Sequence, residues 1–136
     1  MAVKDINIKQ GSNFAKECIR FVLGTTATSQ TAKVVDGVVP GYAFEIVRVE
    51  ANALTVTATI TVDVQIGSTS ALASAITPVA ATPTVGTLSS TLANKRGTAS
   101  EAINLLYTSN GTGAATNGLV SVWIRPIPQN GEVYSV

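Results

Sequence analysis

The last part of the chain constrains the fold most, because two strand-like segments flank a loop of small residues. Residues 102–107 and 119–125 are rich in aliphatic and aromatic side chains, which favours β-strands. The segment 108–118 between them carries Gly and Asn where a turning chain needs positive φ. Pro126 and Pro128 then stop the second strand. The pattern predicts a β-hairpin with a long tip, and an all-β class for the chain.

Residues 54–66 show the clearest alternation in the sequence. Their even positions are aliphatic from Leu54 to Ile66, and their odd positions are Thr, Asp or Gln. This predicts one long strand with a single buried face, and its length favours a bend or a bulge. Residues 42–50 predict the preceding strand, which a turn at 51–52 would join to 54–66 as a second hairpin.

The faces of two further strands follow from the same period of two. In 17–23, Cys18, Arg20 and Val22 are expected on the face opposite Ile19, Phe21 and Leu23. In 42–50, the alternation places Tyr42, Phe44, Ile46 and Arg48 together on one face.

Turn signals and weaker strands complete the outline. Asp36-Gly37 and Pro40-Gly41 predict turns, 71–76 and 84–88 predict short elements, and 95–98 predicts an exposed charged corner. Six to eight short strands predict an all-β sandwich of jelly-roll or immunoglobulin-like type. Residues 1–16 are polar and mixed in charge, so we expect an N-terminal arm, followed by a single domain over 17–136.

Charge is scarce in this 136-residue chain. Charged residues make up 12%, about half of the usual share, and Asp63 is the only charged residue between 51 and 94. Either this is a β-domain built from small residues, or other subunits cover much of its surface. The basic residues are scattered along the sequence and mostly matched by acids. With a net charge of +1, this argues against nucleic acid as a partner.

The sequence also argues against membrane insertion and secretion. The apolar stretch 71–88 is interrupted by Pro78 and Pro83, so it does not suit a membrane span. The first thirty residues lack the pattern of a signal peptide. We therefore expect no membrane partner, and synthesis in a cytoplasm.

The titratable residues do not form a catalytic or metal-binding motif. The chain has no His, which removes the commonest general base and metal ligand. Its single cysteine, Cys18, excludes an intrachain disulfide and is interpreted as a small buried hydrophobe. Glu45 and Glu50 are expected on opposite faces of one strand, which does not suit a glycosidase pair. We predict no enzyme activity, no catalytic residue, no metal site and no cofactor.

Trp123 is the strongest candidate for a contact residue. It lies on the strand face opposite Val120, Val122 and Ile124, where an indole serves either as an interface residue or as a ligand platform. The predicted interface residues are Trp123, Tyr107, Arg125, Phe44 and Tyr42.

The segment 103–126, INLLYTSNGTGAATNGLVSVWIRP, is similar to the C-terminal hairpin of small head decoration (cement) proteins of bacteriophages. The His-free composition, rich in Thr, Ala and Val, and the polar N-terminal segment also resemble that family. The resemblance implies a β-rich, often trimeric protein that bridges capsomers on the capsid surface, without a catalytic motif. It predicts a virion structural protein made in the host cytoplasm, with the major capsid protein and other copies of itself as partners.

Two alternatives to capsid decoration remain. A receptor- or carbohydrate-binding module of a virion fibre or appendage would expose an aromatic platform. A minor enzyme subunit would have a deep pocket with clustered titratable groups.

Overall fold

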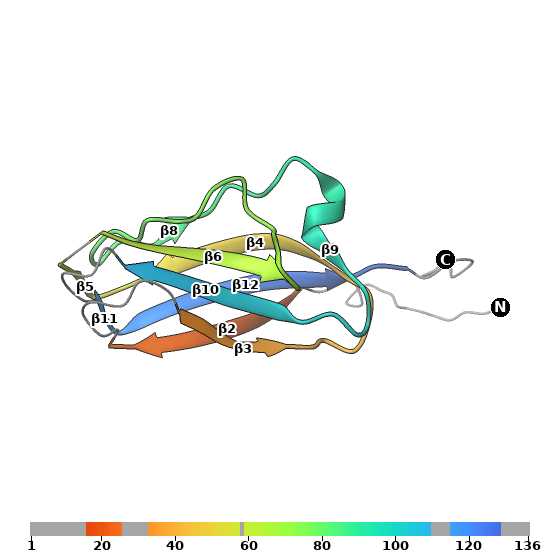
Figure 1. Ribbon diagram of the computed structural model, residues 1–136, viewed down its shortest axis with the longest axis horizontal. Coiled ribbons are helices and arrows are strands. Elements are labelled where there is room, and N and C mark those ends of the chain that lie inside the picture. The colour runs from red at the N-terminus through yellow and green to blue at the C-terminus, as the bar shows by residue number, and fades with distance from the viewer. Residues whose placement is uncertain (1–15, 26–32, 58, 110–114, 129–136) are drawn as a thin grey trace.

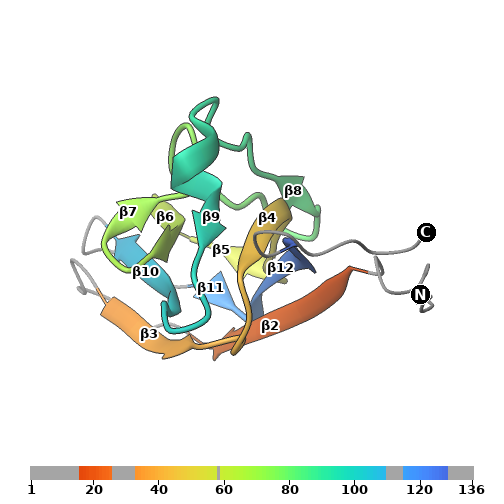
Figure 2. The same ribbon diagram turned by 90° about the vertical axis from the view of Figure 1, so that its right-hand side faces the viewer.

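Two antiparallel β-sheets pack face to face in the computed structural model, which describes residues 16–25, 33–57, 59–109 and 115–128 (Figures 1 and 2). We name each sheet after its best-paired strand. The strands of the β10 sheet are, in spatial order, β3 (Lys33–Val38), β10 (Ile103–Ser109), β6 (Ile60–Ile66) and β7 (Thr69–Ser70).

The β12 sheet forms the other layer. Its strands are β2 (Glu17–Gly24), β12 (Gly118–Pro126), β4 (Phe44–Asn52) and β8 (Thr84–Val85), and β9 (Arg96–Gly97) also pairs with β4. A small ladder of β5 (Thr55–Val56) and β11 (Ala115–Thr116) lies at one end. The short 3-10 helix η2 (Leu92–Lys95) contacts β7 of one sheet and β4 of the other (Figure 2).

The strand pairing is nested, as in a jelly roll. The first strand, β2, pairs with the last, β12, and β3 pairs with β10. Inside these pairs, β4 pairs with β8 and β9, and β6 pairs with β7. In an immunoglobulin sandwich the first two strands share a sheet, whereas β2 and β3 lie in different sheets here. The all-β sandwich is therefore confirmed, and the pairing is that of the jelly-roll alternative.

Both predicted hairpins are wrong, although their strands exist. β10 pairs with β3 and β6, while β12 pairs with β2 and β4, so the segment between them crosses from one sheet to the other. β4 and β6 are separated in the same way, and β4 continues through the predicted turn at 51–52. Alternation identifies the buried face of a strand but not its neighbours.

The predicted strand 54–66 divides into β5 and β6. In β6 the alternation holds, because Ile60, Val62, Val64 and Ile66 are buried while the residues between them are partly exposed. Leu54, at the other end of the segment, is exposed. The buried face is therefore confirmed for β6 alone.

A β-bulge in β4 overturns the predicted face of Arg48. Trp123 lies opposite Arg48 and Ile124 lies opposite Ile46, so Val47 is an extra residue on β4. The bulge reverses the alternation: Phe44 and Ile46 face the core before it, and Val49 faces the core after it. Arg48 consequently points outward, and Glu45 and Glu50, which were expected on opposite faces, both lie on the outward face.

A second bulge explains why Asp36-Gly37 is not a turn. Val38 lies opposite Ile103 and Val35 opposite Leu105, so two residues of β3 face a single residue of β10. The other turn signal, Pro40-Gly41, does fall outside the strands, and Gly41 has a φ of +87°. The predicted corner at 95–98 instead includes β9, with Gly97 buried against Phe44.

The sequence predicts an N-terminal arm and no membrane span. Apart from Lys16, the predicted arm over 1–16 lies outside the described residues. Within the described ranges, no helix is long and apolar enough to cross a membrane.

Candidate interaction surface

The five predicted interface residues separate into core and surface. Phe44 and Tyr107 are 0% exposed, so neither side chain can reach a partner, and this part of the prediction is wrong. For Tyr107 the signal was present in the sequence, because it shares its strand face with Ile103 and Leu105, which are also buried. Trp123, Arg125 and Tyr42 keep accessible surface.

Tyr42, two residues before β4 begins, links the chain to Glu17, the first residue of β2. Its hydroxyl donates a hydrogen bond to Glu17 Oε1. Burial, this hydrogen bond and the negative charge of Glu17 together raise the pKa of Tyr42 to about 12. Glu17 lies opposite Ile124, on the inward side of the β12 sheet. Tyr42 therefore belongs to the end of the sandwich and not to the surface around Trp123.

Trp123 lies on the outer surface of the β12 sheet, which we name the Trp123 face. Strand register aligns side chains across it in rows, with Cys18, Trp123 and Arg48 in one row. Neighbouring rows hold Arg20, Ser121, Glu50 and Val85; Val22, Leu119 and Asn52; and Arg125, Glu45 and Arg96.

The exposure of Cys18 follows from the same register. The sequence interpreted this residue as a buried hydrophobe, but its side chain is exposed, because it lies opposite Trp123 on the outward side of β2. That interpretation is wrong, although the predicted faces of β2 are correct.

The Trp123 ring is held by an arginine. The guanidinium carbon of Arg48 is 5.4 Å from the ring centroid, a cation–π distance. Arg48 Nη2 also donates to Glu50 Oε2 at 3.0 Å, and Asn52 Nδ2 donates to Glu50 Oε1 at 3.3 Å. These contacts hold the indole in place, and such preorganisation is what lowers the entropy cost of binding at protein interfaces.

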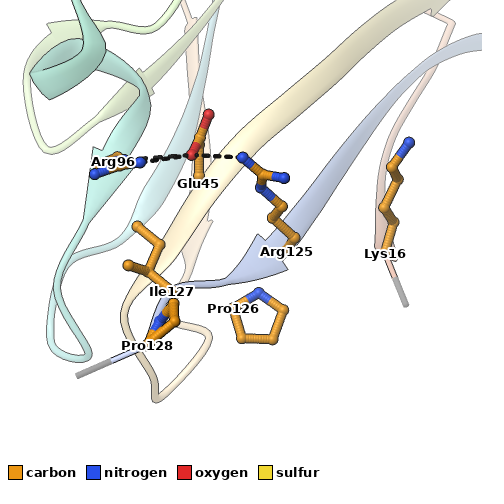
Figure 3. A pocket seen from close by; sticks show the side chains of 7 residues that line it. All are labelled: Lys16, Glu45, Arg96, Arg125, Pro126, Ile127 and Pro128. Atoms are coloured by element: carbon orange, nitrogen blue, oxygen red, sulfur yellow. Dashed lines mark hydrogen bonds and ion pairs between the residues drawn. The ribbon is translucent and has the colours of Figure 1, made fainter. Parts of the chain in front are cut away.

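A hollow of about 310 Å³ lies beside the row that contains Arg125 (Figure 3). Glu45 lies between two arginines there: Oε1 accepts from Arg96 Nη2 and from Arg125 Nη2, both at 3.2 Å. The lining residues are Lys16, Glu45, Arg96, Arg125, Pro126, Ile127 and Pro128. The ion pairs join β9, β4 and β12 at the surface of the sheet.

The electrostatics of Glu45 are dominated by its two partners. Burial alone would raise the pKa of Glu45, but the hydrogen bonds and charges of Arg125 and Arg96 outweigh burial and hold the pKa below its ordinary value. Glu45 is therefore a carboxylate at neutral pH. A carboxylate held in this way is a poor proton acceptor.

This pKa shift predicts how the stability of a Glu45→Gln variant depends on pH. Because the pKa is lowered in the folded state, the contribution of Glu45 to stability is present above about pH 4.3 and is lost as the pH falls through the folded pKa. We expect Glu45→Gln to lower the free energy of unfolding at pH 7, and the difference from wild type to shrink by pH 3. Urea denaturation at both values measures this.

The control is Glu50→Gln, which removes a more exposed ion pair with Arg48. Exposed pairs contribute little, so its effect at pH 7 should be the smaller one. An equal loss for Glu45→Gln at pH 7 and pH 3 would show that the ion pairs to Glu45 do not stabilise the fold.

Positive charge gathers on the Trp123 face. Lys16 at its edge and Arg20, Arg48, Arg96 and Arg125 give five cations, against the two carboxylates Glu45 and Glu50, a surplus of three. On the opposite side of the sandwich, the outward positions of β6 and β10 hold one charged residue, Asp63. The fold therefore brings together basic residues that are scattered along the sequence.

The remaining titratable groups do not gather into a metal site in the part of the chain that the structure describes, where no three Cys, Asp or Glu residues come together. The fold and surface define a small jelly-roll sandwich with one basic, aromatic face. No family model matches the chain, and neither a curated protein nor a solved structure matches it.

Proposed function

We propose that this chain is a non-catalytic virion structural protein that decorates a phage capsid and stabilises it through protein–protein contacts. Its partners are the major capsid protein and two further copies of itself, in a homotrimer on the outer surface of the virion. The Trp123 face carries this proposal, because tryptophan and arginine are the residue types most enriched where binding energy concentrates at protein interfaces.

The stabilisation needs no chemistry. A protein that binds the assembled shell and not its separated subunits favours the shell by mass action. A trimer that contacts several capsid subunits at once adds the advantage of linked binding sites. Small free energies at many identical positions therefore sum to a large effect on the particle.

The geometry around Trp123 favours a protein contact over the carbohydrate-binding alternative. A sugar stacks on an open aromatic face, and the Arg48 guanidinium already lies over the Trp123 ring. The enzyme alternative gains no support from the hollow, where Glu45 is paired with two arginines.

Co-sedimentation tests the proposed function. Purified protein is mixed with undecorated capsids of the phage that encodes it, the capsids are pelleted, and the pellets are heated. We expect saturable binding and a higher melting temperature for decorated capsids than for undecorated ones. If the protein stays in the supernatant and the capsid melting temperature does not change, the decoration proposal is wrong.

A further inference from the structure

We infer that the Trp123 face binds an acidic protein surface, with partner carboxylates opposite its arginines. The inference deepens the proposed function and rests on it for the identity of the partner, a capsid protein. It adds the chemistry of that partner's contact surface, which no motif in the sequence reveals.

The Trp123 face carries more positive than negative charge. Glu50 pairs with Arg48, and Glu45 pairs with both Arg96 and Arg125, so the two carboxylates of the face neutralise two of its five cations. Arg20 and Lys16 are exposed in addition. The face therefore carries a net charge of +3, or +2 when the exposed Glu17 beside Lys16 is included, and such a charge attracts an oppositely charged partner and speeds its association.

The arginines of the hollow beside Arg125 keep exposed surface. The side chains of Arg96 and Arg125 are 42% and 51% exposed although both contact Glu45. A guanidinium has five N–H donors and can bind a carboxylate through two of them, so Arg125 can hold Glu45 and a second carboxylate together. Pro126, Ile127 and Pro128 form an apolar wall nearby (Figure 3). The hollow fits an acidic side chain next to an apolar one.

The residues that lie among the cations favour a protein partner over a nucleic acid. Exposed apolar side chains lie among the cations: Val22 is 74% exposed, and Val85 is also exposed. Glu45 and Glu50 would repel closely spaced phosphates, and the net charge of the whole chain is only +1. Mixed apolar and charged contacts are typical of protein interfaces, whereas a nucleic-acid site needs a continuous basic patch.

The test uses Trp123 as its own reporter, because it is the only tryptophan in the chain. Short poly-glutamate peptide is titrated into the isolated protein while tryptophan fluorescence is recorded, with poly-serine as the neutral reference. We expect a saturable change with poly-glutamate alone. Binding should weaken at least tenfold from about 0.01 M to about 1 M salt, because screening shortens the reach of charge from about 30 Å to about 3 Å.

Charge variants localise the binding. Arg20→Glu changes the net charge of the Trp123 face by two, at a residue that takes no part in the three ion pairs of Glu45 and Glu50. The matched control carries Thr59→Glu and Thr108→Glu, which together make the same change in net charge at exposed positions near the β10 sheet. We expect about a tenfold loss of poly-glutamate affinity for Arg20→Glu and less than a twofold loss for the control.

Several outcomes would overturn the inference: equal losses in the two variants, no preference for poly-glutamate over poly-serine, or tighter binding of a short DNA duplex than of poly-glutamate. The result is independent of capsid binding. Poly-glutamate binding without capsid co-sedimentation would support the acidic-partner inference while refuting the proposed function.

Discussion

Replacing Phe44 with alanine is expected to lower the free energy of unfolding by about 3–5 kcal/mol, the usual cost of removing a buried aromatic ring. Phe44 is fully buried, at the point where β4 begins and β9 pairs with it. Packing there is tight, since a Cβ atom added to Gly97 would lie 2.6 Å from Cε1 of Phe44. The cavity should therefore be poorly refilled. Urea denaturation of the isolated protein measures the change.

Val85→Ala is the control for Phe44→Ala, because Val85 is an exposed apolar residue of the same sheet and should cost less than about 1 kcal/mol. Below its melting temperature, Phe44→Ala should still bind capsids. A stable Phe44→Ala protein that no longer binds would mean that Phe44 acts in an interface, as the sequence first indicated.

Replacing Trp123 with alanine is expected to weaken capsid binding by about 30-fold or more, which corresponds to about 2 kcal/mol. The ring lies on the outer face of the best-paired strand of its sheet, and Arg48 holds it there. Removing the ring takes away contact area with the capsid, and it also removes the cation–π contact that positions Arg48. The fold should tolerate the change, because Val120, Val122 and Ile124 on the other face of β12 supply the core contacts. Co-sedimentation over a range of protein concentrations gives the affinity.

Leu106→Ala is the matched control for Trp123→Ala. Leu106 is a partly exposed apolar residue on the outward face of β10, the strand of the opposite sheet that corresponds to β12. It should leave capsid binding within about twofold of wild type, since surface changes away from an interface have small effects. If both variants bind like wild type, or if both lose binding equally, the Trp123 face is not the contact surface.

The sequence predicted the buried faces of strands well wherever alternation is unbroken. β2, β6 and β12 each bury the residues that the pattern indicates, such as Phe21, Val64 and Val122. It failed at β4, because one extra residue at Val47 reverses the alternation, and it missed β3, because the bulge at Asp36-Gly37 was interpreted as a turn. The bulge at Val47 leaves no clear mark among the apolar residues of β4, so its position could not be predicted.

Strand pairing was harder to predict than strand position. A strand with one apolar face can bury that face whether it forms a hairpin with the next strand in the same sheet or is followed by a strand in the other sheet. In this fold β4 and β6 lie in different sheets, and so do β10 and β12, which creates the nested pairing. The sequences of these strands are compatible both with a hairpin in one sheet and with a connection between the two sheets, so the pairing could not be predicted from them.

The candidate surface was predicted only in part. Trp123 and Arg125 were found because the alternation of 119–125 places them outward. The charge of the face was missed, because Lys16, Arg20, Arg48, Arg96 and Arg125 are far apart in sequence and β4 and β9 bring two of them to β12.

Electron cryomicroscopy of capsids mixed with the protein tests the central claim, that the Trp123 face docks on the shell, most directly. The account predicts density for one sandwich per binding position, with the β12 sheet toward the capsid and acidic capsid residues opposite Arg20, Arg48 and Arg125. Density with the β10 sheet and Asp63 toward the shell, or capsids without added density, would contradict it.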